Sequence, residues 1–117
     1  MIKRIEHVAI IVSSDESISF YKRLGFVEKY RKERQHDTVV IMQLNDDKIE
    51  IFIDPNHPER IANPEAKGLR HLALKVDSVD KTLTELGIMN AHLDKDWTGE
   101  NYCFISDPDG LPIELHE

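Results

Sequence analysis

The sequence predicts an α+β fold built from two tandem copies of a β-α-β-β-β unit. His7 and His71 occupy matching places in two alternating apolar stretches and lie 64 positions apart. Glu50 and Glu114 occupy matching places in two later stretches and are also 64 positions apart. A constant offset shared by two residue types indicates an internal duplication, which guides the whole assignment of elements.

The first copy opens with a predicted strand at residues 5–12, where apolar residues alternate with others. A helix is predicted over residues 15–24, and Gly25 marks its end. Strands follow at residues 26–34, 39–44 and 48–53, separated by polar turns.

The second copy repeats this order. A strand is predicted at residues 69–76 and a helix at 79–86, which Gly87 ends. Strands follow at residues 91–94, 102–106 and 112–116. Because a strand-helix-strand crossover is right-handed, we expect the first and fourth strands of each copy to pair.

The domain organisation follows from the same duplication. Residues 1–117 are expected to form a single domain, with a first module at 1–54 and a second at 69–117. Residues 55–68 contain three prolines and are predicted to be the linker between the modules.

Composition narrows the class of partner. The formal net charge is −7 and no stripe of lysine and arginine stands out, which argues against nucleic acid and against an anionic membrane surface. No apolar run approaches the roughly 20 residues of a membrane-spanning helix. Cys103 is the one cysteine, so no internal disulfide can form, and we expect a cytoplasmic protein.

The period of two in each strand predicts which way the polar residues point. His7, Glu50, His71 and Glu114 all fall on the sheet face that the helix does not cover. If the two sheets come together, they would form a cup-shaped, eight-stranded mixed sheet that encloses all four residues. Other residues predicted to share this face and to line the cup are Gln43, Lys75, Tyr102, Phe104 and His116.

Any one of these four residues is most simply an ordinary strand residue. Two matched histidines and two matched glutamates on one concave face instead predict a metal site with nitrogen and oxygen ligands. Such a set suits one borderline divalent ion, with zinc or nickel favoured and cobalt, manganese or iron as alternatives, rather than calcium or magnesium. Two carboxylates would also neutralise the charge of a dication.

The duplicated unit and its four ligand positions resemble the vicinal oxygen chelate superfamily, which includes glyoxalase I, bleomycin resistance proteins and dioxygenases. The strings GLRHLALKVDSVD and FISDPDGLPIELHE are most similar to small bacterial glyoxalase-like proteins of undefined substrate. The resemblance covers essentially the whole chain. It implies the glyoxalase fold, a homodimer, a small-molecule substrate, and His7, Glu50, His71 and Glu114 as metal ligands.

The resemblance also implies a reaction. We expect a lactoylglutathione lyase-like lyase or isomerase that forms an enediolate on the metal from a small α-hydroxycarbonyl or 2-oxoaldehyde adduct. Glu114 is expected to be the base, while Glu50 stays a ligand. Glyoxalase I typically has an Arg and an Asn for glutathione where this chain has Ile11 and Asp54, which counts against glutathione. The alternative is a drug- or antibiotic-binding or resistance protein that uses the same cup.

Overall fold

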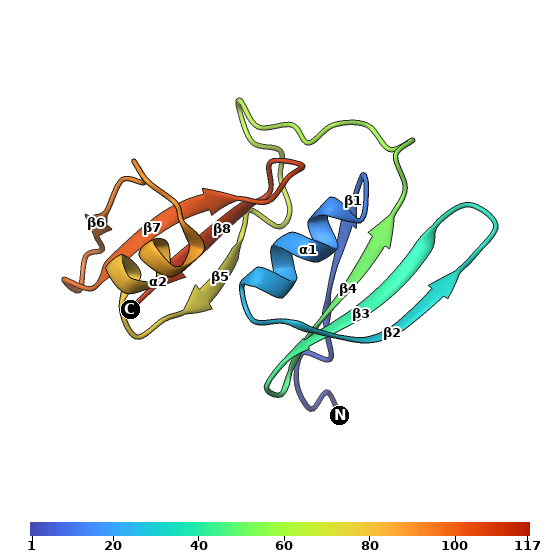
Figure 1. The fold of residues 1–117 in the computed structure, drawn as a ribbon, viewed down its shortest axis with the longest axis horizontal. Coiled ribbons are helices and arrows are strands. Elements are labelled where there is room, and N and C mark those ends of the chain that lie inside the picture. Colours follow the sequence, from blue (N-terminus) through green and yellow to red (C-terminus); the bar gives the residue numbers. More distant parts are fainter. The chain divides into compact units, whose positions relative to one another are not determined.

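The computed structural model describes residues 1–117, which divide into two compact units, Met1–Pro58 and Glu59–Glu117 (Figure 1). The first unit contains β1 (Val8–Val12), α1 (Glu16–Arg23), β2 (Val27–Glu33), β3 (Thr38–Leu44) and β4 (Asp47–Ile53). Its four strands form one sheet in the order β1-β4-β3-β2. Strand β1 runs parallel to β4, and the β4-β3 and β3-β2 pairs are antiparallel.

The second unit has the same architecture. It contains β5 (Leu72–Lys75), α2 (Val79–Leu86), β6 (Asp94–Lys95), β7 (Asn101–Ser106) and β8 (Pro112–His116). The sheet order is β5-β8-β7-β6, again with the first strand parallel to the fourth. Both units are therefore mixed β-α-β-β-β sheets, and the predicted α+β fold class is confirmed.

Each helix contributes the apolar side chains that bury one face of its sheet. In the first unit Ile18 and Tyr21 of α1 are buried, as are Met42 and Ile51 of the sheet. In the second unit, the helix residues Val79, Leu83 and Leu86 and the strand residues Cys103, Ile105, Ile113 and Leu115 are buried. Burial of such side chains is the main favourable contribution to folding, at about 1.5–3 kcal/mol each. The opposite face of each sheet stays free to carry polar residues.

The predicted bounds are wrong for three strands that matter here. Strand β5 begins at Leu72, so His71 precedes the strand instead of lying inside it, and β1 likewise begins one residue after His7. The weak strand predicted at residues 91–94 is the two-residue strand Asp94–Lys95, because only these residues pair with β7.

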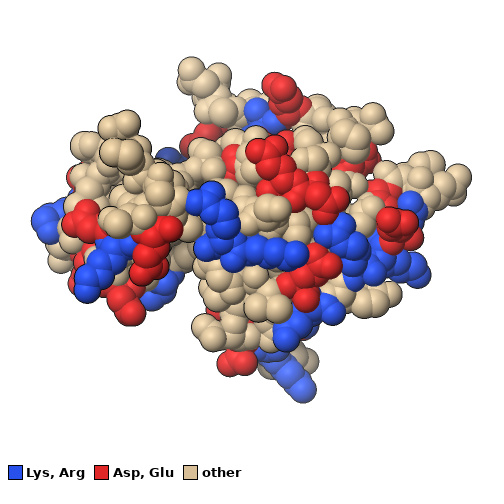
Figure 2. Space-filling view, in the orientation of Figure 1, with Lys and Arg blue, Asp and Glu red and all other residues tan.

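Neither α1 nor α2 has the length and apolar character that a membrane-spanning helix requires. On the face drawn in Figure 2, acidic and basic side chains lie next to one another.

Candidate functional site

In the first unit, the structure places His7 beside Glu50. Glu50 lies in the middle of β4, between the buried residues Ile49 and Ile51, so its side chain points away from the core. His7 comes directly before β1, the strand that pairs with β4. The Nε2 atom of His7 lies 3.0 Å from Oε2 of Glu50. Parallel pairing of β1 with β4 is thus what brings together two residues 43 positions apart in the sequence.

A second carboxylate lies on the other side of the His7 ring. Oε1 of Glu6 is 3.7 Å from Nδ1 of His7 and 2.5 Å from the Nζ atom of Lys48. The ammonium group of Lys48 lowers the pKa of Glu6, so this carboxyl stays ionised beside the imidazole. His7 therefore has a carboxylate near each of its two ring nitrogens.

The second unit repeats the pair with the same atoms. The Nε2 atom of His71 lies 3.0 Å from Oε1 of Glu114. Glu114 occupies the middle of β8 between the buried residues Ile113 and Leu115, as Glu50 does in β4. The side chain of Glu114 is 15% exposed, whereas that of Glu50 is 24% exposed, so the second carboxylate is the more enclosed.

An aromatic wall supports the second pair. Phe104 lies directly opposite Glu114 in the β7-β8 register, and its ring meets that of His71 edge-on with 5.0 Å between centroids. Tyr102, two residues earlier on the same strand face, contacts Phe104 edge-on in turn. These contacts hold the imidazole of His71 against the sheet. Phe104 and Tyr102 lie on the predicted face, as the strand period requires.

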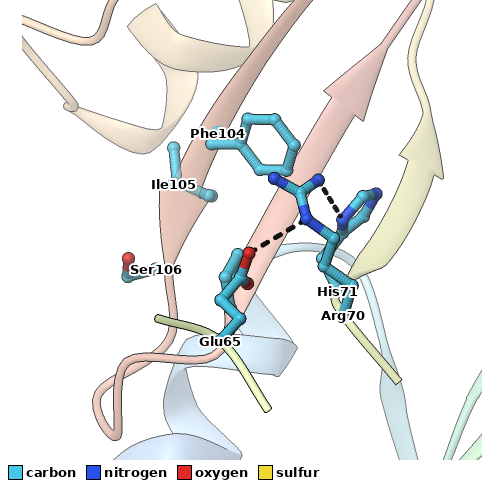
Figure 3. Close-up of a pocket in the computed structure, with 7 residues that line it drawn as sticks. Glu65, Arg70, His71, Phe104, Ile105 and Ser106 are labelled. Carbon is cyan, nitrogen blue, oxygen red and sulfur yellow. Dashed lines mark hydrogen bonds and ion pairs between the residues drawn. The ribbon is translucent and has the colours of Figure 1, made fainter. Parts of the chain in front are cut away.

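Beyond His71 lies a cavity of about 260 Å³. Figure 3 shows the guanidinium of Arg70 between Glu65 and the ring of His71, with the ring of Phe104 beside it. The Nε atom of Arg70 donates to Oε1 of Glu65 at 3.0 Å. Sequence reasoning missed both residues, since Glu65 lies in the predicted linker and a single Arg beside a His carries no signal of its own.

The side chain of His116 contacts the loop between β6 and β7. Its Nε2 lies 2.9 Å from Oδ2 of Asp96 and 3.9 Å from Oε2 of Glu114. The Oδ1 atom of Asp96 accepts hydrogen bonds from Thr98 Oγ1, Thr98 N and Glu100 N. The Thr98 hydroxyl is the largest cause of a lowered pKa for Asp96, and Asp96 in turn raises the pKa of His116. Trp97, in the same loop, is exposed.

The candidate residues thus form two pairs, His7 with Glu50 and His71 with Glu114, each inside its own unit. The expectation that both pairs join in one metal site stays a prediction. In each pair, an imidazole nitrogen and a carboxylate oxygen lie 3.0 Å apart, and nitrogen and oxygen donors of these kinds suit a borderline divalent ion.

A chain with two β-α-β-β-β units that each present a His–Glu pair has the architecture of the vicinal oxygen chelate proteins. The family model described as the Glyoxalase/Bleomycin resistance protein/Dioxygenase superfamily matches residues 4–115. The protein belongs to this superfamily, and the resemblance seen in its sequence is confirmed.

Two curated relatives match along nearly their whole length. YwkD of Bacillus subtilis (strain 168) is 43% identical, with 100% of this chain and 98% of the relative covered. YaeR of Escherichia coli (strain K12) is 38% identical, with 99% and 97% covered. Among solved structures, the glyoxalase family protein from Enterococcus faecalis is 40% identical, with a TM-score of 0.88 and 98% of each chain covered.

More distant structures share the fold alone. Lactoylglutathione lyase from Agrobacterium tumefaciens is 23% identical, with a TM-score of 0.72 and 100% and 95% of the two chains covered. The antibiotic-binding protein TnmS3 from Streptomyces sp. CB03234 is 22% identical, with a TM-score of 0.71 and 98% and 95% covered. One architecture therefore serves both a lyase and a binding protein, and the side chains must decide between them.

Proposed function

We propose that the protein is a metal-dependent, glyoxalase-like lyase or isomerase that acts on a small α-hydroxycarbonyl or 2-oxoaldehyde adduct. Its metal ligands would be His7, Glu50, His71 and Glu114. The observation that carries this proposal is the repeated pair, with a 3.0 Å separation between Nε2 and a carboxylate oxygen in both units. A binding protein would not need the same two donors twice.

The pairs fit a divalent ion in both geometry and charge. Two donors that each lie about 2.1 Å from an ion, at right angles to one another, are about 3.0 Å apart. This is the separation that both pairs have. A hydrogen bond between the two groups has the same length, so the pairs can stay intact before an ion arrives. Members of the superfamily typically bind a divalent metal.

A bound ion would supply Lewis acidity toward two adjacent substrate oxygens. The chain itself must then supply the base. Glu114 would take the proton from the hydroxyl-bearing carbon next to the carbonyl and return it to the former carbonyl carbon, while the hydroxyl proton passes to the other oxygen, which converts one hydroxycarbonyl isomer into the other. The cavity beside His71 supports Glu114 over Glu50, because it offers room for a substrate next to the second pair. Glu50 would remain a ligand throughout.

Glutathione is not favoured as the thiol of such an adduct. Ile11 replaces a cationic side chain and is exposed in β1, where it offers no hydrogen bond. Asp54 replaces an amide, and its Oδ1 already accepts from the backbone N–H of Asn56. An anionic tripeptide would meet an apolar residue and a further anion at these positions.

Metal analysis of the purified protein tests the proposal. We expect about one zinc or nickel ion per chain, and an affinity at least ~100-fold lower in both His7→Ala and His71→Ala, since each removes a ligand itself. His92→Ala is the matched control. The side chain of His92 is 88% exposed, and its Nε2 lies 3.9 Å from Oδ2 of Asp94. Unchanged metal content in both site variants would overturn the metal site.

The metal content of a mixture of His7→Ala and His71→Ala tells how the two pairs join in the proposed homodimer. If a site uses the first unit of one chain and the second unit of its partner, a mixed dimer regains one intact site. If each site lies within one chain, mixing restores nothing, since every chain lacks one histidine. The cytoplasmic location of the protein stays a prediction.

A further inference from the structure

The cavity beside His71 lies next to the ligand pair and is distinct from it. The pair uses the Nε2 side of the His71 ring, where Glu114 lies. Arg70 approaches the opposite nitrogen, with 3.4 Å between Nη1 and Nδ1. The apolar walls of the cavity are Phe104, Ile105 and Pro112, and its polar residues include Arg70 and Glu65. A molecule bound at the pair could therefore extend a substituent past Phe104 into this space.

The guanidinium of Arg70 is the donor that such a substituent would meet. Its carbon lies 5.9 Å from the centroid of the Phe104 ring, and its Nε is bonded to Glu65 (Figure 3). A guanidinium carries five N–H donors in a planar fork, and the hydrogen bond to Glu65 uses one of them. The side chain of Arg70 is 65% exposed. Donors on its terminal nitrogens can therefore bind a ligand.

The charges around the cavity favour an anion. Glu65 is shared by two cations, because Nη2 of Arg60 lies 3.5 Å from Oε2 of Glu65. The same Arg60 atom donates to the backbone oxygen of Arg70 at 2.7 Å, which fixes the loop that carries the second guanidinium. Two guanidinium groups and one carboxylate leave a single positive charge, in a chain whose formal net charge is −7. One further carboxylate would balance it.

We propose that this cavity binds a substituent of the substrate that ends in a carboxylate, and that Arg70 recognises that group. The proposal rests on the function proposed above and names the class of substrate: a metal-chelating hydroxycarbonyl or adduct with a free carboxylate a few bonds away. Arginine suits this task because its fork binds a carboxylate through two parallel hydrogen bonds. Phe104 would hold the fork in place from below.

Two small chelators that differ only at their tail provide the test. Succinic acid monohydroxamate offers two adjacent oxygens and a terminal carboxylate, and its primary amide has the same shape without the charge. Isothermal titration calorimetry on the zinc-loaded, full-length protein gives both dissociation constants. We expect the carboxylate form to bind ~10-fold or more tightly than the amide, as a charge-assisted pair should.

Arg70→Met should reduce this preference to ~2-fold or less and leave the affinity for the amide within ~3-fold, because the fork bonds only the charged tail. Arg34→Met is the matched control. Arg34 also lies over a phenylalanine ring, 5.4 Å from the centroid of Phe52, and is paired with the carboxylate of Asp37. This variant loses the same charge and should keep the preference. Circular dichroism and zinc content verify that both variants are folded and loaded.

Several outcomes would overturn the inference. If the wild-type protein binds the two hydroxamates with equal affinity, the cavity does not recognise a carboxylate on the substrate. A preference that survives in Arg70→Met, or that disappears equally in Arg34→Met, would remove Arg70 as its source. In these cases the zinc-loaded protein still binds the amide form, so the metal site stands. A wild-type protein that takes up no zinc and binds neither compound would overturn the proposed function and this inference together.

Discussion

The two units of the protein carry the same pair of residues in different surroundings. In both, Nε2 of a histidine lies 3.0 Å from a glutamate oxygen, and the glutamate occupies the middle of the fourth strand. The residue before the histidine differs: it is Glu6 in the first unit and Arg70 in the second. A carboxylate thus approaches Nδ1 of His7, whereas a guanidinium approaches Nδ1 of His71.

This difference suggests that the two pairs have different roles. A histidine that binds a metal through Nε2 carries its proton on Nδ1 and is best supported by an acceptor there. Glu6 is such an acceptor, while Arg70 can only donate. The first pair is therefore surrounded as a ligand pair should be. The second pair has no such acceptor at Nδ1 of His71 and instead adjoins the cavity lined by Arg70 and Phe104.

The largest effect should separate the two glutamates. Glu114→Gln removes the proposed base, so turnover at saturating metal should fall by ~10²–10⁴-fold. Glu50→Gln should weaken metal binding and lower turnover far less once metal is in excess. Steady-state kinetics of both variants, on a substrate found by screening carboxylate-bearing hydroxycarbonyls, gives the comparison. Equal losses of turnover in the two metal-saturated variants would contradict the assignment of Glu114.

The residues behind the histidines should change metal affinity in opposite directions. Glu6→Gln removes the acceptor near His7, and we expect zinc affinity to fall ~3- to 10-fold, toward the low end of outer-shell effects because the contact is 3.7 Å long. Arg70→Met removes a cation near the ion, and affinity should rise ~2- to 5-fold. Competition with a chromophoric chelator measures both. Glu59→Gln is the control: it replaces an exposed glutamate at the start of the second unit and should leave the zinc affinity unchanged. Shifts of the same sign in both site variants would show that the two units are equivalent.

Much of the fold was predictable because the duplication repeats each local signal. Val79–Leu86 and Pro112–His116 have the predicted bounds, and in both units the first strand pairs with the fourth. The start of β5 was wrong because strand propensity alone does not say where the ladder with β8 begins. The two-residue strand β6 was misplaced for a similar reason, since only pairing with β7 defines it.

The pairs and the strand face that carries Phe104 and Tyr102 were predictable, whereas the charged residues around the pairs were not. The 64-residue offset identifies His7, Glu50, His71 and Glu114, and parallel pairing then brings each His to its Glu. Glu65 lies in the linker, where no periodic pattern exists to place its side chain. The hydrogen bond between His116 and Asp96 joins residues 20 positions apart. Asp96 lies in a loop, and no sequence pattern predicts such a contact.

The smallest effect concerns His116, which the first unit replaces with Phe52 at the same offset. Nδ1 of His116 lies 2.6 Å from the carbonyl oxygen of Glu117, and Nε2 lies 2.9 Å from a carboxylate oxygen of Asp96. Both partners are acceptors, so only the protonated imidazolium can donate to both. This agrees with the raised pKa of His116, which Asp96 causes.

The raised pKa gives the stability of the second unit a pH dependence of known sign. The folded protein holds the proton of His116 more tightly than the unfolded chain, whose histidine titrates near 6.5. The stabilisation is therefore complete below this pH and is lost as the pH rises through the raised pKa of the folded state.

His116→Phe keeps an aromatic ring where His116 stacks on Tyr102 and removes both hydrogen bonds. In urea unfolding without metal, the stability advantage of the wild type over this variant should shrink from about pH 5.5 to pH 9. His92→Phe changes an exposed histidine, and its difference from the wild type in free energy of unfolding should not shrink over this pH range. An advantage that is constant or grows with pH would mean that His116 is neutral in the fold, and that one of its two ring contacts lacks a proton to donate.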